Sequence, residues 1–343
     1  MYRIPPFGAW VVRKIIVNAP ITNSWPAPAK INLFLHIIGR RPNGYHNLET
    51  VFQFLDLADE VTLEPRRDGR IQRLVDPIGN PGSDLASVPA QQDLTVRAAK
   101  ILKTATATRL GVDIGITKRI PMGGGLGGGS SDAATTLVGL NRVWGLGLDV
   151  DALAKIGVTL GADVPVFVRG QAAFASGIGE KLMPVVLEEP WYLVIYPGCS
   201  VATASVFNAP DLTRDTLPIK IHTLLERETG QEGASDGHDT FAEQEHLRSV
   251  FSLLTRMGND CEQVVRRRHP PVDAALDWLS RFGPARMTGT GACVFAPFRE
   301  KQEAERILAM LPNARTMVKD QDKAWSGFVT RGRNRSLLNN VPL

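Results

Sequence analysis

A glycine-rich stretch in the first half of the chain restricts the fold more than any other feature. Six of the twelve residues from Pro121 to Asp132, PMGGGLGGGSSD, are glycine. Glycine weakens helix and strand interiors, but it tolerates positive φ and lets a backbone approach a ligand closely. The next residues predict a helix with Ser130 or Ser131 at its N-terminus. Such a loop presents unpaired N–H groups and the positive end of a helix dipole, which favours a bound phosphate.

Other interpretations of this loop fit less well. A flexible linker does not usually lead directly into an alanine-rich amphipathic helix. A Walker A loop needs Gly-Lys followed by Ser or Thr, and no lysine follows these glycines. Gly123, Gly125 and Gly128 fit G-x-G-x-x-G, but residues 117–121 before them are charged and end in proline, unlike the apolar strand of a dinucleotide-binding fold. No H-R-D or D-F-G stretch follows, which excludes a protein kinase.

Composition is that of an ordinary soluble globular protein. A length of 343 residues suggests two domains that share a cleft. The net charge of +4 suits small anionic ligands and does not specifically favour binding to nucleic acid. Three scattered cysteines indicate reduced thiols in a cytoplasm. No apolar run reaches the roughly 18 residues of a membrane span, so we expect neither a nucleic-acid nor a membrane partner.

Residues 1–26 are the least regular part of the chain. They carry three basic residues, and no acidic residue appears before Glu49. Because Arg13 and Lys14 split the only apolar stretch, a secretory signal is disfavoured. We expect a dispensable N-terminal extension, either disordered or produced by a start codon placed too early.

A strand with a period of two is predicted over Ala29–Gly39. Ile31 and alternate apolar residues fall on one face and should be buried, whereas Lys30 and Asn32 are neighbours on the other face. These two residues lie about 6 to 7 Å apart at strand rise. A solvated edge lysine is the simpler interpretation, and the paired asparagine raises the chance of a site.

A hairpin turn follows this strand. Asn43-Gly44 is a strong hairpin signal, and it places Tyr45 and His46 at the tip or at the start of a return strand over 48–57. These two side chains can stack on a ring and hydrogen-bond to it. An exposed turn pair without function is the alternative.

The rest of the chain alternates between helical and strand patterns. Helices are expected over 92–104, 150–160, 241–256, 272–281 and 299–311, with Asp93 and Asp149 as N-caps, and strands over 111–119, 172–176, 181–186 and 191–196. Residues 287–295 predict a second glycine turn that leads into a strand. Residues 226–240 predict a mobile loop, and the residues after Asp320 a solvated tail. Thr203 and Phe207 fall in a connection after the strand at 191–196.

One carboxylate stands at an element junction. Asp163 lies in GADVPVFV, two residues before Pro165, with an apolar strand-like run behind it. A turn or cap role is the usual one for such an aspartate. Catalytic groups are also often held at junctions of this kind.

Several motifs resemble those of the GHMP kinases, which include galactokinase and homoserine, mevalonate and phosphomevalonate kinases. PMGGGLGGGSSDAA resembles their loop P-x-G-x-G-L-G-S/G-S-S almost throughout. Four further motifs resemble the branch that acts on 4-diphosphocytidyl-2-C-methyl-D-erythritol in non-mevalonate isoprenoid synthesis: PAKINLFLHIIGRRPNGYHNLETVFQFLDLAD, LGADVPVFV, GNDCEQVV and MTGTGACVF. The resemblance runs from about residue 27 to about residue 320.

The resemblance implies an α+β, two-domain fold with the active site in the cleft between the domains. The N-terminal ATP-binding domain would cover 27–187, and a ferredoxin-like α/β C-terminal domain would cover 188–320. Residues 1–26 would then be an extension and 321–343 a tail. A cytoplasmic enzyme that is a monomer or a weak homodimer is implied.

The resemblance also assigns roles to individual residues. Asp163 would be the catalytic base and Lys30 its partner, stabilising developing charge. Mg²⁺ would bridge the β and γ oxygens of ATP, held by metal ligands that stay unknown. Thr203 would lie near the methylerythritol or the diphosphate, and Phe207 would stack on cytosine. The cytidine would also face Asn32, Tyr45 and His46. The ATP phosphates would be held by Pro121, Met122, Gly123, Gly124, Gly125, Leu126, Gly127, Gly128, Gly129, Ser130 and Ser131.

The activity implied is ATP-dependent phosphorylation of the 2-hydroxyl of a cytidine diphosphate derivative of methylerythritol. The alternatives are another small-molecule GHMP kinase of the mevalonate or homoserine type, a nucleotide-binding protein without catalysis, and a dinucleotide oxidoreductase. Tyr45, His46 and Phe207 favour a cytidine-bearing substrate. The presence of both Lys30 and Asp163 argues against a dead kinase.

Overall fold

The computed structural model describes residues 23–74, 88–219, 249–312 and 325–340. Within these ranges, ten strands form one sheet with the order β3-β4-β2-β10-β7-β9-β8; β1 and β5 also pair with β2, and β6 pairs with β5. Their bounds are β1 Ser24–Arg40, β2 His46–Arg66, β3 Ile71–Arg73, β4 Gly111–Thr117, β5 Ala173–Ser176, β6 Lys181–Pro184, β7 Trp191–Tyr196, β8 Arg286–Met287, β9 Val294–Phe298 and β10 Ser326–Arg333. Sheet and helices together confirm the α+β class.

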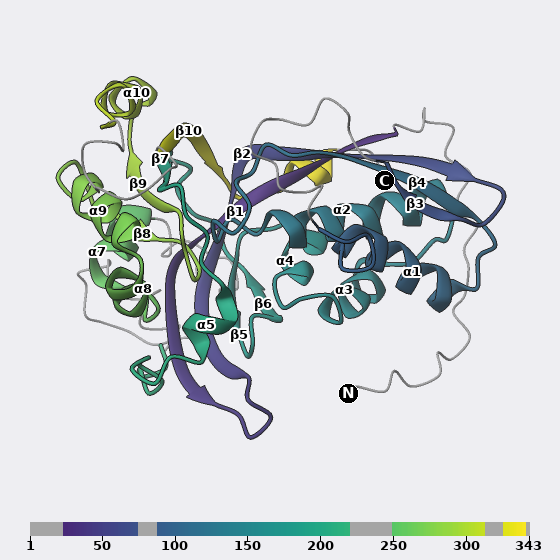
Figure 1. Cartoon of the computed structure of the whole chain (residues 1–343), viewed down its shortest axis with the longest axis horizontal. Helices are drawn as coiled ribbons and strands as arrows, with labels where there is room; N and C mark the ends of the chain where they lie inside the picture. The colour runs from purple at the N-terminus through teal and green to yellow at the C-terminus, as the bar shows by residue number, and fades with distance from the viewer. Residues whose placement is uncertain (1–22, 75–87, 220–248, 313–324, 341–343) are drawn as a thin grey trace, which may run out of the picture.

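Helices cover this sheet in two groups (Figure 1). The first group is α1 Leu94–Thr106, α2 Gly128–Val143, α3 Val150–Val158 and α4 Val164–Arg169. The second is α7 Val250–Arg256, α8 Glu262–Arg268, α9 Pro270–Leu279 and α10 Lys301–Ala309, and the short α5 Thr203–Phe207 stands between the groups. None of the helices in the described ranges is long and apolar enough to cross a bilayer.

The first helical group packs on the part of the sheet made by β1, β2 and β4. Trp25, Leu63, Leu137 and Phe167 belong to the core between these layers. At Gly139 a Cβ atom would lie 2.5 Å from a methyl carbon of Leu63, so α2 approaches the sheet more closely than a residue with a side chain would allow. This close packing holds α2, which the glycine loop joins at Gly128, against the sheet.

The second group packs on β10, β7, β9 and β8, which lie in this order. Helices α8 and α9 connect β7 to β8, and α10 connects β9 to β10. This βαββαβ order with the last strand beside the first is the split βαβ arrangement of ferredoxin-like domains, as the family resemblance implied. Helix α8, in the GNDCEQVV region, was not predicted as a helix.

The expectation of a solvated tail after Asp320 is wrong over β10. Its residues pair with β7 from Ser326 to Arg331, and then with β2 at Gly332 and Arg333. A Cβ atom at Gly332 would lie 2.8 Å from the Tyr192 ring, and Thr330 is buried. The strand therefore joins the two parts of the sheet. Its arginines suggested a solvated segment, but Arg331 donates to the Glu189 carbonyl and Arg333 pairs with Asp56.

Most predicted elements are confirmed, with shifted bounds. The Asp93 carboxylate accepts a hydrogen bond from the Thr95 N–H at 2.8 Å, and Asp149 accepts one from the Ala152 N–H at 2.7 Å, so both cap helices as expected. The hairpin at Asn43-Gly44 is present, but its return strand β2 runs over 21 residues, not ten. The loop predicted over 226–240 lies outside the described residues.

The expected extension over 1–26 is wrong at its C-terminal end. Strand β1 begins at Ser24, and the Trp25 side chain is 0% exposed in the main core. We therefore expect a chain that begins at Pro26 to be about 3–5 kcal/mol less stable than one that begins at Asn23, because a buried tryptophan is lost. Thermal unfolding of the two truncated chains measures the difference, and equal melting temperatures would contradict it.

Candidate active site

A cleft of about 930 Å³ opens between the first helical group and α5. It is lined by the β1–β2 hairpin, the glycine loop, the start of α4, the helix α5 and the turn at Gly289-Thr290. Every site residue predicted from the sequence lines this cleft except Ser131, which is buried in the first turn of α2. Residues spread over 178 positions of the chain, from 30 to 207, are thus brought to one cavity.

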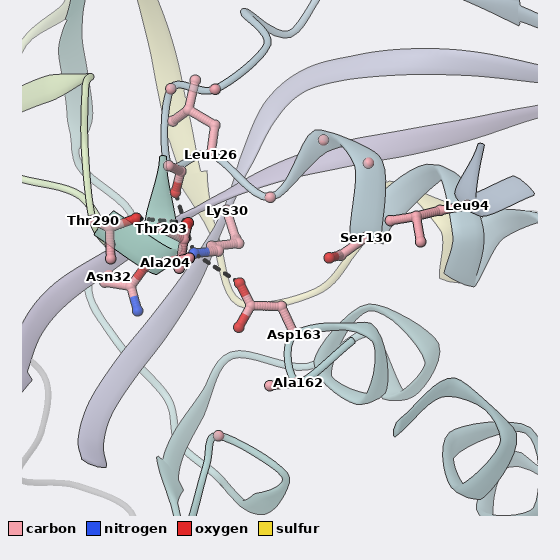
Figure 2. Close-up of a pocket in the computed structure, with 18 of the residues that line it drawn as sticks. Lys30, Asn32, Leu94, Leu126, Ser130, Ala162, Asp163, Thr203, Ala204 and Thr290 are labelled. Atoms are coloured by element: carbon pink, nitrogen blue, oxygen red, sulfur yellow. Dashed lines mark hydrogen bonds and ion pairs between the residues drawn. The ribbon is translucent and has the colours of Figure 1, made fainter. Parts of the chain in front are cut away.

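Lys30 and Asp163 form an ion pair at the centre of the cleft (Figure 2). The Lys30 Nζ lies 3.1 Å from the Asp163 Oδ2. The Lys30 side chain is 4% exposed and that of Asp163 is 33% exposed, so the cation is enclosed while the carboxylate still meets the cavity. A carboxylate with this exposure can reach a bound hydroxyl group.

Three more contacts hold the Lys30 ammonium. It donates to the Asn32 Oδ1 at 2.6 Å and to the Gly125 carbonyl at 3.2 Å, and it lies 5.3 Å from the centroid of the Phe52 ring. The predicted neighbourhood of Lys30 and Asn32 on one face of the strand is confirmed. Together these contacts leave the ammonium little freedom to move away from Asp163.

Asn32 is itself fixed by two threonines. Its Nδ2 donates to the Thr50 Oγ1 at 2.9 Å, and its backbone N–H donates to the Thr288 Oγ1 at 3.0 Å. The side chain therefore acts mainly on Lys30 in this structure. A contact with a substrate would use the second hydrogen of Nδ2.

The prediction of an apolar strand after Asp163 is wrong, because Val164–Arg169 is the helix α4. Pro165 lies in the first turn, the one place in a helix that tolerates proline. Asp163 occupies the N-cap position, yet its side chain makes no capping hydrogen bond. Its carboxylate is turned toward Lys30 instead (Figure 2), so a residue type that commonly caps helices is free for chemistry here.

The carbonyl oxygens of the glycine loop are occupied by the protein. The Gly123 and Gly124 carbonyls accept from the N–H groups of Ala292 and Cys293 at 3.2 and 3.0 Å, and the Leu126 carbonyl accepts from the Lys30 N–H at 3.0 Å. The two glycine motifs of the sequence therefore pack directly on each other. With its carbonyls bound behind it, the loop can offer N–H groups to an anion in the cleft.

Helix α2 begins at Gly128, so the prediction of Ser130 or Ser131 at its N-terminus is wrong by two residues or more. Gly127 is the N-cap, with φ of 74° and no side chain to bond the first N–H groups. Those donors stay available for a ligand. A Cβ atom at Gly127 would lie 3.0 Å from the Lys30 Cε, which explains why serine does not take this place.

A charge cluster beneath the loop was not predicted from the sequence. Lys118 Nζ donates to the Asp132 Oδ2 at 2.7 Å and also to the Asp59 carboxylate, and all three side chains are buried. Asp59 accepts from the Arg119 and Ile120 N–H groups as well. Burial raises the pKa of Asp132 to about 7, against the opposing charge of Lys118. For Lys118, burial lowers the pKa, but the charges of Asp132 and Asp59 outweigh it and raise the pKa.

The other end of the cleft carries the aromatic residues of the hairpin and α5. His46 stacks on Phe207 with ring centroids 5.1 Å apart at 26°, while Tyr45 is 57% exposed at the turn. Phe207 and Thr203 lie on a short helix, not in an irregular connection as expected. The Thr203 Oγ1 lies 3.0 Å from the Thr290 Oγ1 (Figure 2), so the MTGTGACVF turn also reaches the cleft.

Comparison with known proteins agrees with this geometry. The family described as GHMP kinases N terminal domain matches residues 93–171, and GHMP kinases C terminal matches 241–315. The 4-diphosphocytidyl-2-C-methyl-D-erythritol kinase of Alkalilimnicola ehrlichii is 50% identical over 90% of both chains. This chain belongs to the 4-diphosphocytidyl-2-C-methyl-D-erythritol kinases, a branch of the GHMP kinases. It is therefore a small-molecule kinase, and this family uses ATP.

Further relatives of this GHMP kinase support the assignment. The same-named kinase of Nitrosococcus oceani is 49% identical over 92% of this chain and 96% of its own. A crystal structure of 4-(cytidine 5'-diphospho)-2C-methyl-D-erythritol kinase superposes with a TM-score of 0.67 at 28% identity, covering 90% of this chain and 98% of that one. The Methanococcus jannaschii mevalonate kinase, at 17% identity, 91% and 98% coverage and a TM-score of 0.60, shares the fold.

Sequence reasoning missed several residues of this kinase that the structure brings to the cleft. Lys118, Asp132 and Thr290 line it directly, and Thr288 acts through Asn32. Lys118 could have been noticed as a lysine three residues before the loop, but its carboxylate partners are 14 and 59 positions away. Among the described residues, no group of three His, Cys, Asp or Glu side chains could hold a metal ion.

Proposed function

We propose that this chain transfers the γ-phosphoryl group of ATP to the 2-hydroxyl of 4-diphosphocytidyl-2-C-methyl-D-erythritol. The observation that carries the proposal is the Lys30–Asp163 pair, 3.1 Å apart, between a phosphate-type loop and an aromatic wall. The loop supplies a place for the donor, the wall a place for the pyrimidine of the acceptor, and the pair lies where the two would meet.

The carboxylate of Asp163 then acts as the base. It accepts the proton of the 2-hydroxyl while that oxygen attacks the γ-phosphorus and the bond to the β-phosphate oxygen breaks, giving the 2-phosphate and ADP. Lys30 stabilises the negative charge that develops on the transferred group. In a loose transition state, positioning and charge neutralisation contribute most, and the Asn32 and Gly125 contacts of Lys30 serve both.

The shape of the cleft supports one orientation of ATP. Leu94, in the first turn of α1, and Ile116, on β4, add apolar side chains to the wall of the cleft. Apolar walls suit a flat purine, so this arrangement favours the base against Leu94 and Ile116 and the γ-phosphate near Lys30.

Magnesium fits this site as part of the ATP substrate. Mg²⁺ typically binds through phosphates, waters and one or two protein oxygens, which agrees with a cleft that offers the Ser130 hydroxyl and the Asp163 carboxylate near the loop. We further propose a cytoplasmic location, supported by three cysteines, Cys199, Cys261 and Cys293, that are free thiols.

The acceptor is tested by measuring ADP release with three alcohols: the cytidylyl compound, mevalonate and homoserine. We expect kcat/KM to be at least about a hundredfold higher for the cytidylyl compound, because the smaller alcohols have no pyrimidine that could stack on the aromatic wall. Omitting the acceptor controls for hydrolysis of ATP. Preferred turnover of mevalonate or homoserine would refute the acceptor but leave the kinase assignment intact.

A further inference from the structure

Arg214, in the loop after α5, contacts His46 and Phe207 of the proposed acceptor site without lining the cleft itself. Its Nε lies 3.1 Å from the Nε2 of His46. Its Nη2 donates to the Phe207 carbonyl at 3.1 Å and to the Ala209 carbonyl at 2.6 Å, and its Nη1 donates to the Leu212 carbonyl at 3.0 Å. One guanidinium thus joins the hairpin to the end of α5, across 168 positions of the chain.

The contact with His46 fixes the protonation of that ring. An arginine Nε always carries hydrogen and can only donate, so the His46 Nε2 must accept. The imidazole is then neutral, with its single hydrogen on Nδ1. Burial lowers the pKa of His46, and the charges of Arg214 and of Arg40 lower it further. Arg40 is the β1 residue paired with His46 in the hairpin, and α5 presents the uncharged Phe207 ring.

The contacts with the loop fix Phe207. A helix as short as α5 leaves its last carbonyl groups without partners inside the helix. Arg214 binds the carbonyl of Phe207, the final residue of α5, and two carbonyls beyond it. Since the Phe207 ring stacks on His46, the same guanidinium holds both rings in one arrangement.

We propose that Arg214 is a positioning residue for the acceptor: it holds His46 as the Nδ1–H tautomer and keeps His46 and Phe207 together as a preformed wall for the pyrimidine. This inference rests on the proposed function. It assigns Arg214 to the recognition of the acceptor alone, since its hydrogen bonds go to His46 and to the segment from Phe207 to Leu212.

Two variants separate the charge of Arg214 from its geometry. Arg214→Gln removes the cation and most of the donors. Arg214→Lys keeps the cation, but one ammonium cannot reach His46 and three carbonyls at once. The matched control is Arg267→Gln, which removes an exposed cation that pairs with Asp211 near the same loop and has no contact with His46.

For Arg214→Gln, we expect the KM of the cytidylyl acceptor to rise about tenfold or more, with kcat and the KM of ATP nearly unchanged. The acid limb of its kcat/KM profile should also shift to higher pH. The Arg214 charge lowers the pKa of His46, so removing that charge lets the ring protonate at a higher pH. Arg214→Lys should raise the acceptor KM but keep the acid limb near that of the wild type. Arg267→Gln should change neither.

Nitrogen-15 NMR of the histidine-labelled wild type gives a readout that needs no turnover. We expect His46 in the Nδ1–H form, and a mixture of tautomers in Arg214→Gln. A wild-type His46 in the Nε2–H form would overturn the proposal, whatever the variants do. The proposal would also be overturned if Arg214→Gln raised the KM values of acceptor and ATP equally and left the acid limb of kcat/KM unchanged. That result would indicate a merely structural role for Arg214. A wild type inactive on the cytidylyl compound but with the expected tautomer would refute the proposed function and leave the Arg214–His46 contact standing.

Discussion

Replacing Asp163 by asparagine should lower kcat by about a thousandfold, within the range known for general-base groups. The amide has nearly the same shape but cannot accept the proton of the attacking hydroxyl. Lys30 keeps its contacts with Asn32 and Gly125, so the site should stay assembled and the KM of ATP should change little. Steady-state release of ADP under saturating acceptor measures the loss.

Asp151→Asn is the matched control for this variant. Asp151 lies in the first turn of α3, where it pairs with Arg169, and its side chain is 69% exposed. An exposed pair of this kind contributes at most about 1 kcal/mol to stability, and the residue lies outside the cleft lining. We expect its kinetics to match the wild type. A loss of less than about tenfold in Asp163→Asn would show that positioning, without a base, carries the reaction.

Replacing Gly125 by alanine should disable the glycine loop. A Cβ atom there would lie 2.3 Å from the Thr288 carbonyl oxygen and 2.9 Å from that of Gly291, and the φ of Gly125 is +75°. Neither backbone oxygen can move freely, because both belong to the turn on which the loop packs. We expect a loss of about 2–5 kcal/mol in stability from the clash and the backbone strain together. The KM of ATP should rise at least about tenfold, since the shifted loop also carries the carbonyl that holds Lys30.

Gly145→Ala isolates the strain from the clash. Gly145 has φ of +63°, but a Cβ atom there would meet nothing within 4 Å. Alanine should therefore cost about 1 kcal/mol in stability and leave both KM values unchanged. Thermal unfolding and steady-state kinetics of the two alanine variants give the comparison. Equal effects at Gly125 and Gly145 would contradict the importance of the close approach between the two glycine motifs.

Local patterns predicted the parts of this protein whose forces act over a few residues. The N-caps Asp93 and Asp149 bind N–H groups two or three positions away. The period-two strand placed Lys30 beside Asn32, and the structure has them hydrogen-bonded at 2.6 Å. In each case the interacting groups are so near in sequence that backbone geometry alone brings them together.

The errors arise where distant segments decide the outcome. VPVFVR is apolar and β-branched, which favours a strand, yet it packs as the helix α4 against the core under α2. SGFVTRGR carries arginines at alternate positions, yet β10 completes the sheet because β2 and β7 each leave an edge for it. Propensity is a weak influence compared with such tertiary packing.

The glycine loop shows both what the sequence could predict and what it could not. By itself the sequence predicted a backbone loop for phosphate at the start of a helix, and the glycines at 123, 125 and 127 do adopt the positive φ values that this residue tolerates best. It also determined the family, through motifs in a fixed order. Only the tertiary structure decided that the loop carbonyls are bound from behind, that Asp163 turns to Lys30, and that Arg214 holds His46. These contacts join groups from 95 to 169 positions apart, so no local pattern records them, and they exist only once the chain has folded.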